Sequence, residues 1–217
     1  MTKPPILTAR YTAAVERARI LHSEVRKGTT IPYLSHLLSV SALVLEHGGT
    51  EDQAIAALLH DAAEDHGGHR MLDIIRAEFG EVVGDIVEAC SDSLVEDRTN
   101  KAPWWDRKRA YLAHLQHAPD VAVLVSGADK LHNARAVLAD YRRVGERLWG
   151  RFNPDADWLG SCWYYGRLAD VLSARLESLG DDAQALAAEL RRTVDGLHAE
   201  VGREHGDLAA RLAAVAH

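Results

Sequence analysis

The sequence predicts an all-α fold, a single bundle of about eight to ten helices. Two observations carry this prediction. Ala, Leu, Arg, Asp and Glu are abundant whereas Phe and Ile are scarce, and this composition favours helix over strand. Apolar residues also recur at helical spacing along most of the 217 residues, and no strand-like pattern is longer than the apolar run Val121–Val125.

Three helices are predicted in the first part of the chain, over about residues 8–25, 35–48 and 50–65. Ser35 is a candidate N-cap for the second helix. Residues 50–53 (Thr-Glu-Asp-Gln) have the pattern of a capping box that opens the third. Because residues 54–59 are apolar on every side, this third helix is expected in the middle of the bundle, continuing through the residues that follow Leu59.

Six further helices are predicted along the rest of the chain. Their approximate ranges are 69–79, 81–92, 103–115, 119–141, 154–179 and 182–203. A polar loop precedes Pro103, which is well suited to the first position of its helix. Residues 1–179 are expected to form the functional domain. Residues 180–217 are expected to be a C-terminal helical extension packed on or beside it, with a short tail after Gly206.

Composition excludes several classes of protein. The formal net charge of −7 argues against general nucleic-acid binding, which needs a basic surface, although a local basic cleft could still bind an anionic small molecule. Cys90 and Cys162 have no CxxC spacing, so neither a disulfide framework nor a thiolate zinc site is expected. No signal-like or membrane-spanning apolar stretch occurs. A cytoplasmic protein without membrane contact is therefore expected, and a homo-oligomer is possible.

A His-Asp pair, His60 and Asp61, directly follows the apolar third helix. A buried imidazole beside a buried carboxylate costs free energy unless something satisfies both, and a divalent cation would do so. His36 and Asp129, on other predicted buried helices, could complete a set of two imidazoles and two carboxylates. Such a set suits manganese, iron or another borderline ion. A lone His-Asp pair is more often a helix-end or surface pair, so the surrounding pattern has to decide.

Polar residues return on the same helix face one turn after these candidate ligands. Glu64 and Asp65 follow His60 and Asp61, and Asn133 follows Asp129. A second acidic pair beside a metal could orient or deprotonate a water molecule. Taken alone, Glu64 and Asp65 are better explained as a solvated helix end before two glycines.

Four sequence blocks, in order, resemble the HD-domain hydrolases of alarmone metabolism, which are the hydrolase half of the RelA/SpoT proteins and the small alarmone hydrolases. The resemblance covers roughly residues 10–172. The blocks are 26–28 with 32–36 (RKG and PYLSH), 56–65 (AALLHDAAED), 79–83 (FGEVV) and 128–135 (ADKLHNAR).

The resemblance implies a manganese-dependent hydrolase that removes pyrophosphate from the ribose 3′ position of ppGpp or pppGpp. Iron, zinc, cobalt or magnesium could replace manganese. By motif position, the metal ligands would be His36, His60, Asp61 and Asp129. Glu64 and Asp65 would position and activate the attacking water, which makes them the implied catalytic pair. Asn133 would contact the ribose or base, and Arg26 and Lys27 would flank the nucleotide. Tyr164 is the candidate for a pocket wall from the aromatic group 158–165.

The sequence also departs from the family pattern. His66 stands where the family usually has Thr, and Ser126-Gly127 stands where Lys-Leu is frequent. A phosphate-binding lysine cannot be placed in the longer loop: the candidates are Lys101, Arg107 and Lys108, and each is more easily explained as a solvated helix residue. These departures put the substrate in question. The alternatives are another nucleotide (ppApp, NADPH or a deoxynucleoside monophosphate) or a catalytically silent HD binding module.

Overall fold

The computed structural model describes residues 6–95, 102–153 and 155–215. In these ranges all regular structure is helical apart from one isolated β-bridge between Val25 and Pro32. The α-helices are α1 (Ala9–Leu21), α2 (Tyr33–Glu46), α3 (Glu51–Leu59), α4 (Ala62–Asp65), α5 (Gly68–Phe79), α6 (Glu81–Cys90), α7 (Trp104–Leu115), α8 (Asp120–Val144), α9 (Asp157–Leu176), α10 (Asp181–His205) and α11 (Leu208–Val215). Two 3₁₀ helices are η2 (Gly145–Arg151) and η3 (Glu177–Leu179). The predicted all-α class is confirmed.

Helix α3 lies in the interior of the bundle, as its sequence predicts. The Thr50 side chain accepts the backbone N–H of Gln53 while the Gln53 side chain accepts that of Thr50, so the capping box is present. Every residue from Gln53 to Leu59 is buried, and α3 packs against α1, α2, α6 and α8.

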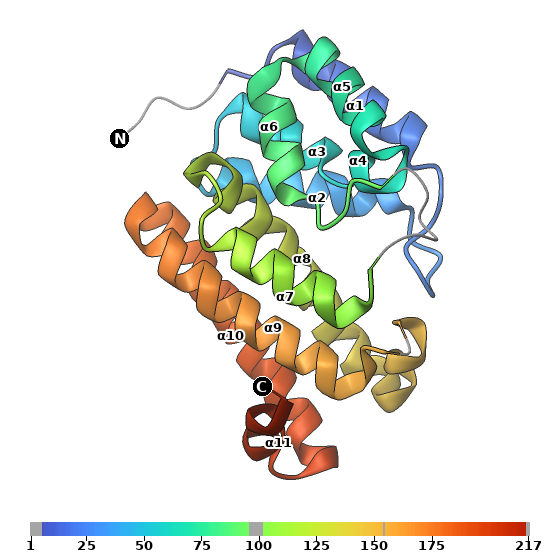
Figure 1. Cartoon of the computed structure of the whole chain (residues 1–217), viewed down its shortest axis with the longest axis vertical. Helices are drawn as coiled ribbons and strands as arrows, with labels where there is room; N and C mark the ends of the chain where they lie inside the picture. The colour runs from blue at the N-terminus through green and yellow to red at the C-terminus, as the bar shows by residue number, and fades with distance from the viewer. Residues whose placement is uncertain (1–5, 96–101, 154, 216–217) are drawn as a thin grey trace.

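The long helix α8 crosses the centre of the molecule between two groups of helices (Figure 1). Helices α2, α3 and α6 pack on one side of it, and α9 and α10 pack on the other. Leu186, Leu190 and Val194 of α10 belong to the same core cluster as the helices of the first half of the chain. The C-terminal segment is thus packed closely on the rest, and the division at residue 179 stays a prediction.

The first predicted helix ends earlier than expected. Helix α1 stops at Leu21, where the His22 N–H makes the last helical hydrogen bond to Ala18 O, and the His22 ring turns inward. The chain then reverses through residues 22–32 around the Val25–Pro32 bridge. Pro32, not Ser35, is the N-cap of α2.

Other boundaries are also corrected. The third helix does not continue through His60 and Asp61: α3 ends at Leu59, and the single turn α4 begins at residue 62. Pro103 is the N-cap of α7 rather than its first residue. The segment after Gly206 forms α11 instead of an irregular tail.

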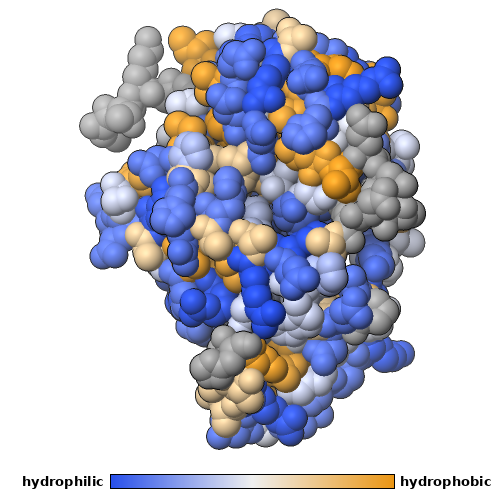
Figure 2. Space-filling view, viewed as in Figure 1, coloured by the Kyte–Doolittle hydropathy of each residue, from blue (hydrophilic) through white to orange (hydrophobic). Residues whose placement is uncertain are grey.

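The face of the molecule shown in Figure 2 is mainly hydrophilic, with apolar side chains scattered in small groups. Among the helices that the structure describes, none has both the length and the apolar character that crossing a membrane requires.

Candidate metal centre

Three segments bring two imidazoles and two carboxylates to one point in the interior. His36 comes from α2, His60 and Asp61 from the junction of α3 and α4, and Asp129 from α8. His36 Nε2 lies 3.2 Å from Asp129 Oδ1 and 3.6 Å from Asp61 Oδ2. His60 Nε2 lies 3.1 Å from Asp61 Oδ2 and 3.5 Å from Asp129 Oδ1. The break between α3 and α4 is what turns both His60 and Asp61 toward this point.

The His60 ring is fixed with one nitrogen toward the cluster. Its Nδ1 donates to the carbonyl oxygen of Ala57 at 2.8 Å, one turn earlier in the chain. Its Nε2 is buried and has no hydrogen-bond partner among the described residues. Because Nδ1 carries the proton in this bond, the Nε2 lone pair faces the two carboxylates, an orientation typical of a metal-binding imidazole.

The His36 ring is oriented by His132. Arg26 Nη1 donates to His132 Nδ1 at 3.0 Å, so this nitrogen is an acceptor, and His36 Nδ1 donates to it at 2.8 Å. Burial first, and then the neighbouring His36 imidazole and the Arg26 guanidinium, lower the pKa of His132 to about 4, which keeps the His132 ring neutral. His36 Nε2 is thereby left with its lone pair toward Asp129.

Both carboxylates are held by hydrogen bonds from neighbouring side chains. The Tyr33 hydroxyl donates to Asp61 Oδ2 at 2.6 Å. Asn133 Nδ2 donates to one oxygen of Asp129 and Lys130 Nζ to the other, each at 2.6 Å. Burial alone would raise the pKa of Asp129, but the charges of Lys130 and His60 outweigh it and hold that pKa well below its usual range.

The His60 pKa is shifted in the complementary direction. Burial would lower it, yet the carboxylates of Asp61 and Asp129 raise the pKa of His60 well above its ordinary value. Without a cation, the two carboxylates thus favour a proton on His60 Nε2; a divalent cation at the same point would take the place of that proton and bind the nitrogen. The ligand atoms of His36, His60 and Asp129 lie within 4.8 Å of one another. This donor set, with an orphaned buried nitrogen in it, fits a divalent cation.

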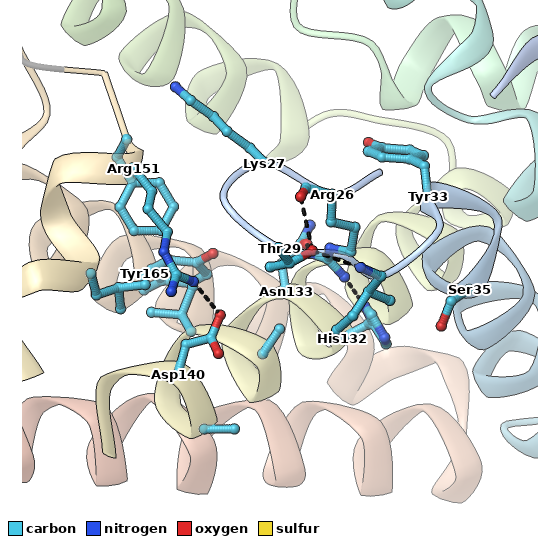
Figure 3. Close-up of a pocket in the computed structure, with 16 residues that line it drawn as sticks. Arg26, Lys27, Thr29, Tyr33, Ser35, His132, Asn133, Asp140, Arg151 and Tyr165 are labelled. Atoms are coloured by element: carbon cyan, nitrogen blue, oxygen red, sulfur yellow. Dashed lines mark hydrogen bonds and ion pairs between the residues drawn. The ribbon is translucent and has the colours of Figure 1, made fainter. Parts of the chain in front are cut away.

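A cavity of ≈ 360 Å³ is lined by Tyr33, His132 and Asn133, which hydrogen-bond to the candidate ligands. Figure 3 shows the residues that line this cavity. Arg26, Lys27 and Arg151 supply cationic groups to its lining, and Tyr165 supplies an aromatic ring. Arg26 points toward His132 and Asn133, with Nη2 donating to Asn133 Oδ1 at 2.7 Å. The predicted residues Arg26, Lys27 and Asn133 therefore share one pocket. Its size is in the range of small-molecule sites.

A second cavity, of ≈ 220 Å³, adjoins the first and shares Asn133, Phe152 and Tyr165 with it. Lys108, Lys130 and Tyr164 also line it. The Tyr164 hydroxyl is buried and has no hydrogen-bond partner among the described residues. The two cavities together give an aromatic-lined space with cationic groups at both ends.

The prediction that Arg107 and Lys108 are solvated is wrong. Both side chains are largely buried and pair with Asp92: Arg107 Nη1 and Lys108 Nζ each lie 2.7 Å from Asp92 Oδ2. Burial would raise the pKa of Asp92, but Lys108 and Arg107 hold that pKa well below its usual range. Asp92 belongs to the polar stretch for which the sequence predicts only a loop.

The predicted acidic pair lies on α4, one turn beyond Asp61. The Asp65 N–H donates to Asp61 O at 2.9 Å, and Glu64 Oε2 accepts the backbone N–H of Asp92 at 3.4 Å. Glu64 thus lies between the metal-ligand candidates and the Asp92 cluster. The remaining predicted residue, Lys101, is outside the described residues.

Several residues of the site were not predicted from the sequence. His132, Lys130 and Tyr33 hold the candidate ligands, and Arg151 and Tyr165 line the pocket. One signal was available for three of them, because Tyr33, Lys130 and His132 lie inside blocks that resemble the family. Arg151, at the end of a 3₁₀ helix outside the blocks, offered no such signal.

Comparison with known proteins agrees with this architecture. The family model described as HD domain matches residues 14–151. A solved structure reported as a metazoan ortholog of SpoT that hydrolyses ppGpp and plays a role in starvation responses superposes with a TM-score of 0.63 at 20% identity. It covers 88% of this chain and 97% of that one. At 20% identity, this structural similarity establishes a shared fold and nothing further.

Curated relatives are similar over part of their length. Guanosine-3′,5′-bis(diphosphate) 3′-pyrophosphohydrolase MESH1 of Xenopus tropicalis is 40% identical over 120 residues, 54% of this chain and 60% of that protein. A probable guanosine-3′,5′-bis(diphosphate) 3′-pyrophosphohydrolase of Synechocystis sp. is 30% identical over 164 residues, 72% of this chain and 21% of that protein. The match thus spans less than two thirds of either relative.

Proposed function

The chain belongs to the HD domain family, and from that membership we propose that it is a metal-dependent hydrolase of ppGpp-like nucleotides. The reaction would release pyrophosphate from the ribose 3′ position of ppGpp or pppGpp, the activity for which the relatives from Xenopus and Synechocystis are named. One observation carries the proposal: His36, His60, Asp61 and Asp129 converge beside a pocket lined by cationic side chains.

In this proposal the four converging side chains hold the cation, and manganese is the ion that we favour. When bound, a divalent cation lowers the pKa of a water molecule and neutralises charge on a phosphoryl oxygen. The site is preorganised for a cation. Hydrogen bonds to Ala57 O and His132 orient the two imidazoles, and hydrogen bonds from Tyr33 and Lys130 orient the carboxylates.

Glu64 and Asp65 are proposed to position the attacking water and to accept its proton. The turn of α4 sets this acidic pair one helical turn from Asp61, which supports the role. A carboxylate that takes the water proton as the water oxygen bonds to phosphorus avoids the formation of free hydroxide. The bond from phosphorus to the ribose 3′ oxygen then breaks, and the same proton can pass to that oxygen. General-base catalysis of this kind contributes about 10²–10⁴-fold to a rate.

The two adjoining cavities are proposed to bind the nucleotide. A substrate with phosphate groups at both the 5′ and the 3′ position needs cations at two separated places. Arg26, Lys27 and Arg151 line one cavity, and Lys108 and Lys130 line the other. Asn133, Tyr165 and Phe152, which border both, would contact the ribose and base. Tyr164 would add its hydroxyl to the second cavity. The proposed setting is the cytoplasm, with a small nucleotide as the binding partner.

The direct test is to incubate the metal-free protein with ppGpp and manganese and to separate the products. The proposal predicts pyrophosphate and GDP in equal amounts, no turnover without metal, and loss of both bound metal and turnover in Asp61→Ala. Asp73→Ala, which removes an exposed carboxylate of α5, is the matched control and should behave like the parent.

Other products would redirect the proposal. If orthophosphate is the only product, or if the protein turns over only ppApp, NADPH or deoxynucleoside monophosphates, the proposed substrate is wrong. The proposed metal-dependent chemistry would still stand. Unchanged metal content and activity in Asp61→Ala would remove the assigned centre. Metal-loaded protein that binds nucleotides without turnover would indicate a binding module.

A further inference from the structure

A second group of metal-binding side chains lies outside the centre described above. His22 follows the end of α1, Glu24 begins the segment that leads to Arg26, and His66 follows the end of α4. One ligand atom from each residue lies within 4.8 Å of the other two. Two segments that are distant in sequence, residues 22–24 and the end of α4 at His66, therefore meet at two imidazoles and one carboxylate.

The spacing of these atoms is suitable for a shared ion. His22 Nδ1 lies 2.9 Å from Glu24 Oε1 and 3.5 Å from His66 Nε2. Zinc bonds nitrogen and oxygen at about 2.0–2.1 Å in a tetrahedral arrangement, which sets neighbouring ligand atoms about 3.3 Å apart. His22 Nδ1 is thus near coordination spacing from both partners.

The burial of His22 supports a ligand role. Its side chain has no exposed surface, and its Nε2 has no hydrogen-bond partner among the described residues. The nitrogen that would bind the cation is Nδ1, which burial keeps from water and which faces the Glu24 carboxylate at 2.9 Å and the His66 imidazole at 3.5 Å. The Glu24 carboxylate, which is partly exposed, would leave one side of the ion open to water.

We propose that His22, Glu24 and His66 form a second divalent-cation site, for which zinc is the best-suited ion. Two imidazoles and one carboxylate leave the fourth position of a tetrahedral ion to water. The ion would fasten the start of the 22–32 segment to the end of α4. It would therefore fix the segment that carries Arg26 relative to the turn that carries Glu64.

The two centres are separated by the ring of Tyr33. His22 stacks on Tyr33 with ring centroids 5.0 Å apart, and Tyr33 meets His36 edge-on at 5.5 Å. The Tyr33 hydroxyl binds Asp61 of the first centre. Each centre thus has its own ligands, and loss of one ion need not remove the other.

Metal counting on the full-length, untagged protein tests the proposal. After equilibration with zinc and removal of free metal, His66→Thr should hold one ion fewer per chain than the parent. Thr is the residue that the resembling family usually carries at this position. His69→Thr is the matched control, because it removes an exposed imidazole three residues away and should leave the zinc content unchanged. Circular dichroism verifies that each variant is folded.

A second pair of variants separates this site from the proposed catalytic centre. In an Asp61→Ala background, adding His66→Thr should remove one further ion and abolish the rise in melting temperature on adding zinc. The second site is overturned if His66→Thr binds as much zinc as the parent. It is also overturned if the double variant binds as much zinc as Asp61→Ala alone. If Asp61→Ala retains all its metal while His66→Thr loses one ion, the assignment of the first metal centre is refuted and the second cation site is supported.

Discussion

Two faces of helix α8 are packed in different ways. On one side Asp129 meets His36 and His60, where buried charges and lone pairs face one another. Two residues earlier, Gly127 faces Leu172, Leu176 and Leu186; a Cβ added to it would lie 2.9 Å from Leu186 Cδ2. The apolar side is held by contact alone, whereas the polar side gathers buried carboxylates that the proposed cation would balance.

This difference also explains the family departures in α8. Gly127 stands where a leucine is frequent, and Leu186 of α10 fills the space that a side chain there would occupy. The neighbouring Ser126 is buried and accepts a hydrogen bond from the Tyr111 hydroxyl at 3.2 Å. Both departures therefore change packing, while Asp129 and Asn133 on the polar side retain the family residues.

The largest expected effect comes from removing a charge on the polar side. Asp129→Ala should lose the metal and lower kcat by about 10³-fold or more, because a bound cation supplies several kcal/mol of charge stabilisation. Metal analysis and steady-state kinetics on the same preparation measure both effects. A variant that loses activity while retaining its metal would show that Asp129 acts on something other than the ion.

A smaller effect is expected at the buried ion pair of Asp92. Asp92→Asn leaves Arg107 and Lys108 without their anion and should lower the free energy of unfolding by about 3 kcal/mol. Asp85→Asn is the control, because Asp85 is exposed and its pair with Arg76 is worth under about 1 kcal/mol. Urea denaturation measures the free energy of unfolding of both variants. An equal decrease in Asp92→Asn and Asp85→Asn would contradict the prediction.

The Asp92 contribution should also depend on pH. Its pKa in the folded protein lies below the ordinary value, so the stabilisation is present above the unfolded-state pKa of about 4 and is lost as the pH falls. The difference in unfolding free energy between the parent and Asp92→Asn should therefore narrow between pH 6 and pH 3. A difference that is constant over this range would mean that packing, not charge, is the cause.

On the apolar side, overpacking should cost stability without touching the metal. Gly127→Leu places a side chain against Leu186 and Leu176 and should lower the free energy of unfolding by about 1–3 kcal/mol. The metal content should equal that of the parent. A loss of metal in Gly127→Leu would show that the two sides of α8 are coupled.

The smallest effect is expected from a residue that orients a ligand without binding the ion. His132→Ala removes the acceptor for His36 Nδ1 and should weaken metal affinity by about 10–100-fold, the typical cost of losing such a partner. His117→Ala, which removes an exposed imidazole on another segment, is the control. Competition with a metal-binding dye measures both, and identical affinities would contradict the orienting role.

Local patterns were sufficient to predict most of the helices and the ligand candidates, but not the break between α3 and α4 or the helix α11. The capping box and the apolar run of α3 predicted both a helix and its interior position, and family-like blocks pointed to residues such as His36 and Asp129. What the sequence did not predict depends on contacts between distant segments. The His22–His66 pair joins residues 44 apart, and Lys108 is buried only because Asp92 lies across from it.

The ring orientations at the centre could not be predicted for the same reason. Which nitrogen of His36 faces the carboxylates depends on His132, 96 residues away, and on Arg26 from a third segment. The sequence also gave no sign that α10 would supply Leu186, Leu190 and Val194 to the main core, because an amphipathic helix does not reveal its partner.

Anomalous diffraction from crystals of the manganese-loaded protein, recorded at the manganese edge, tests the central claim most directly. The account predicts one strong peak bounded by His36, His60, Asp61 and Asp129, with both imidazoles bonding through Nε2. Manganese-loaded crystals with no peak among these four side chains, whatever other peaks they contain, would contradict it.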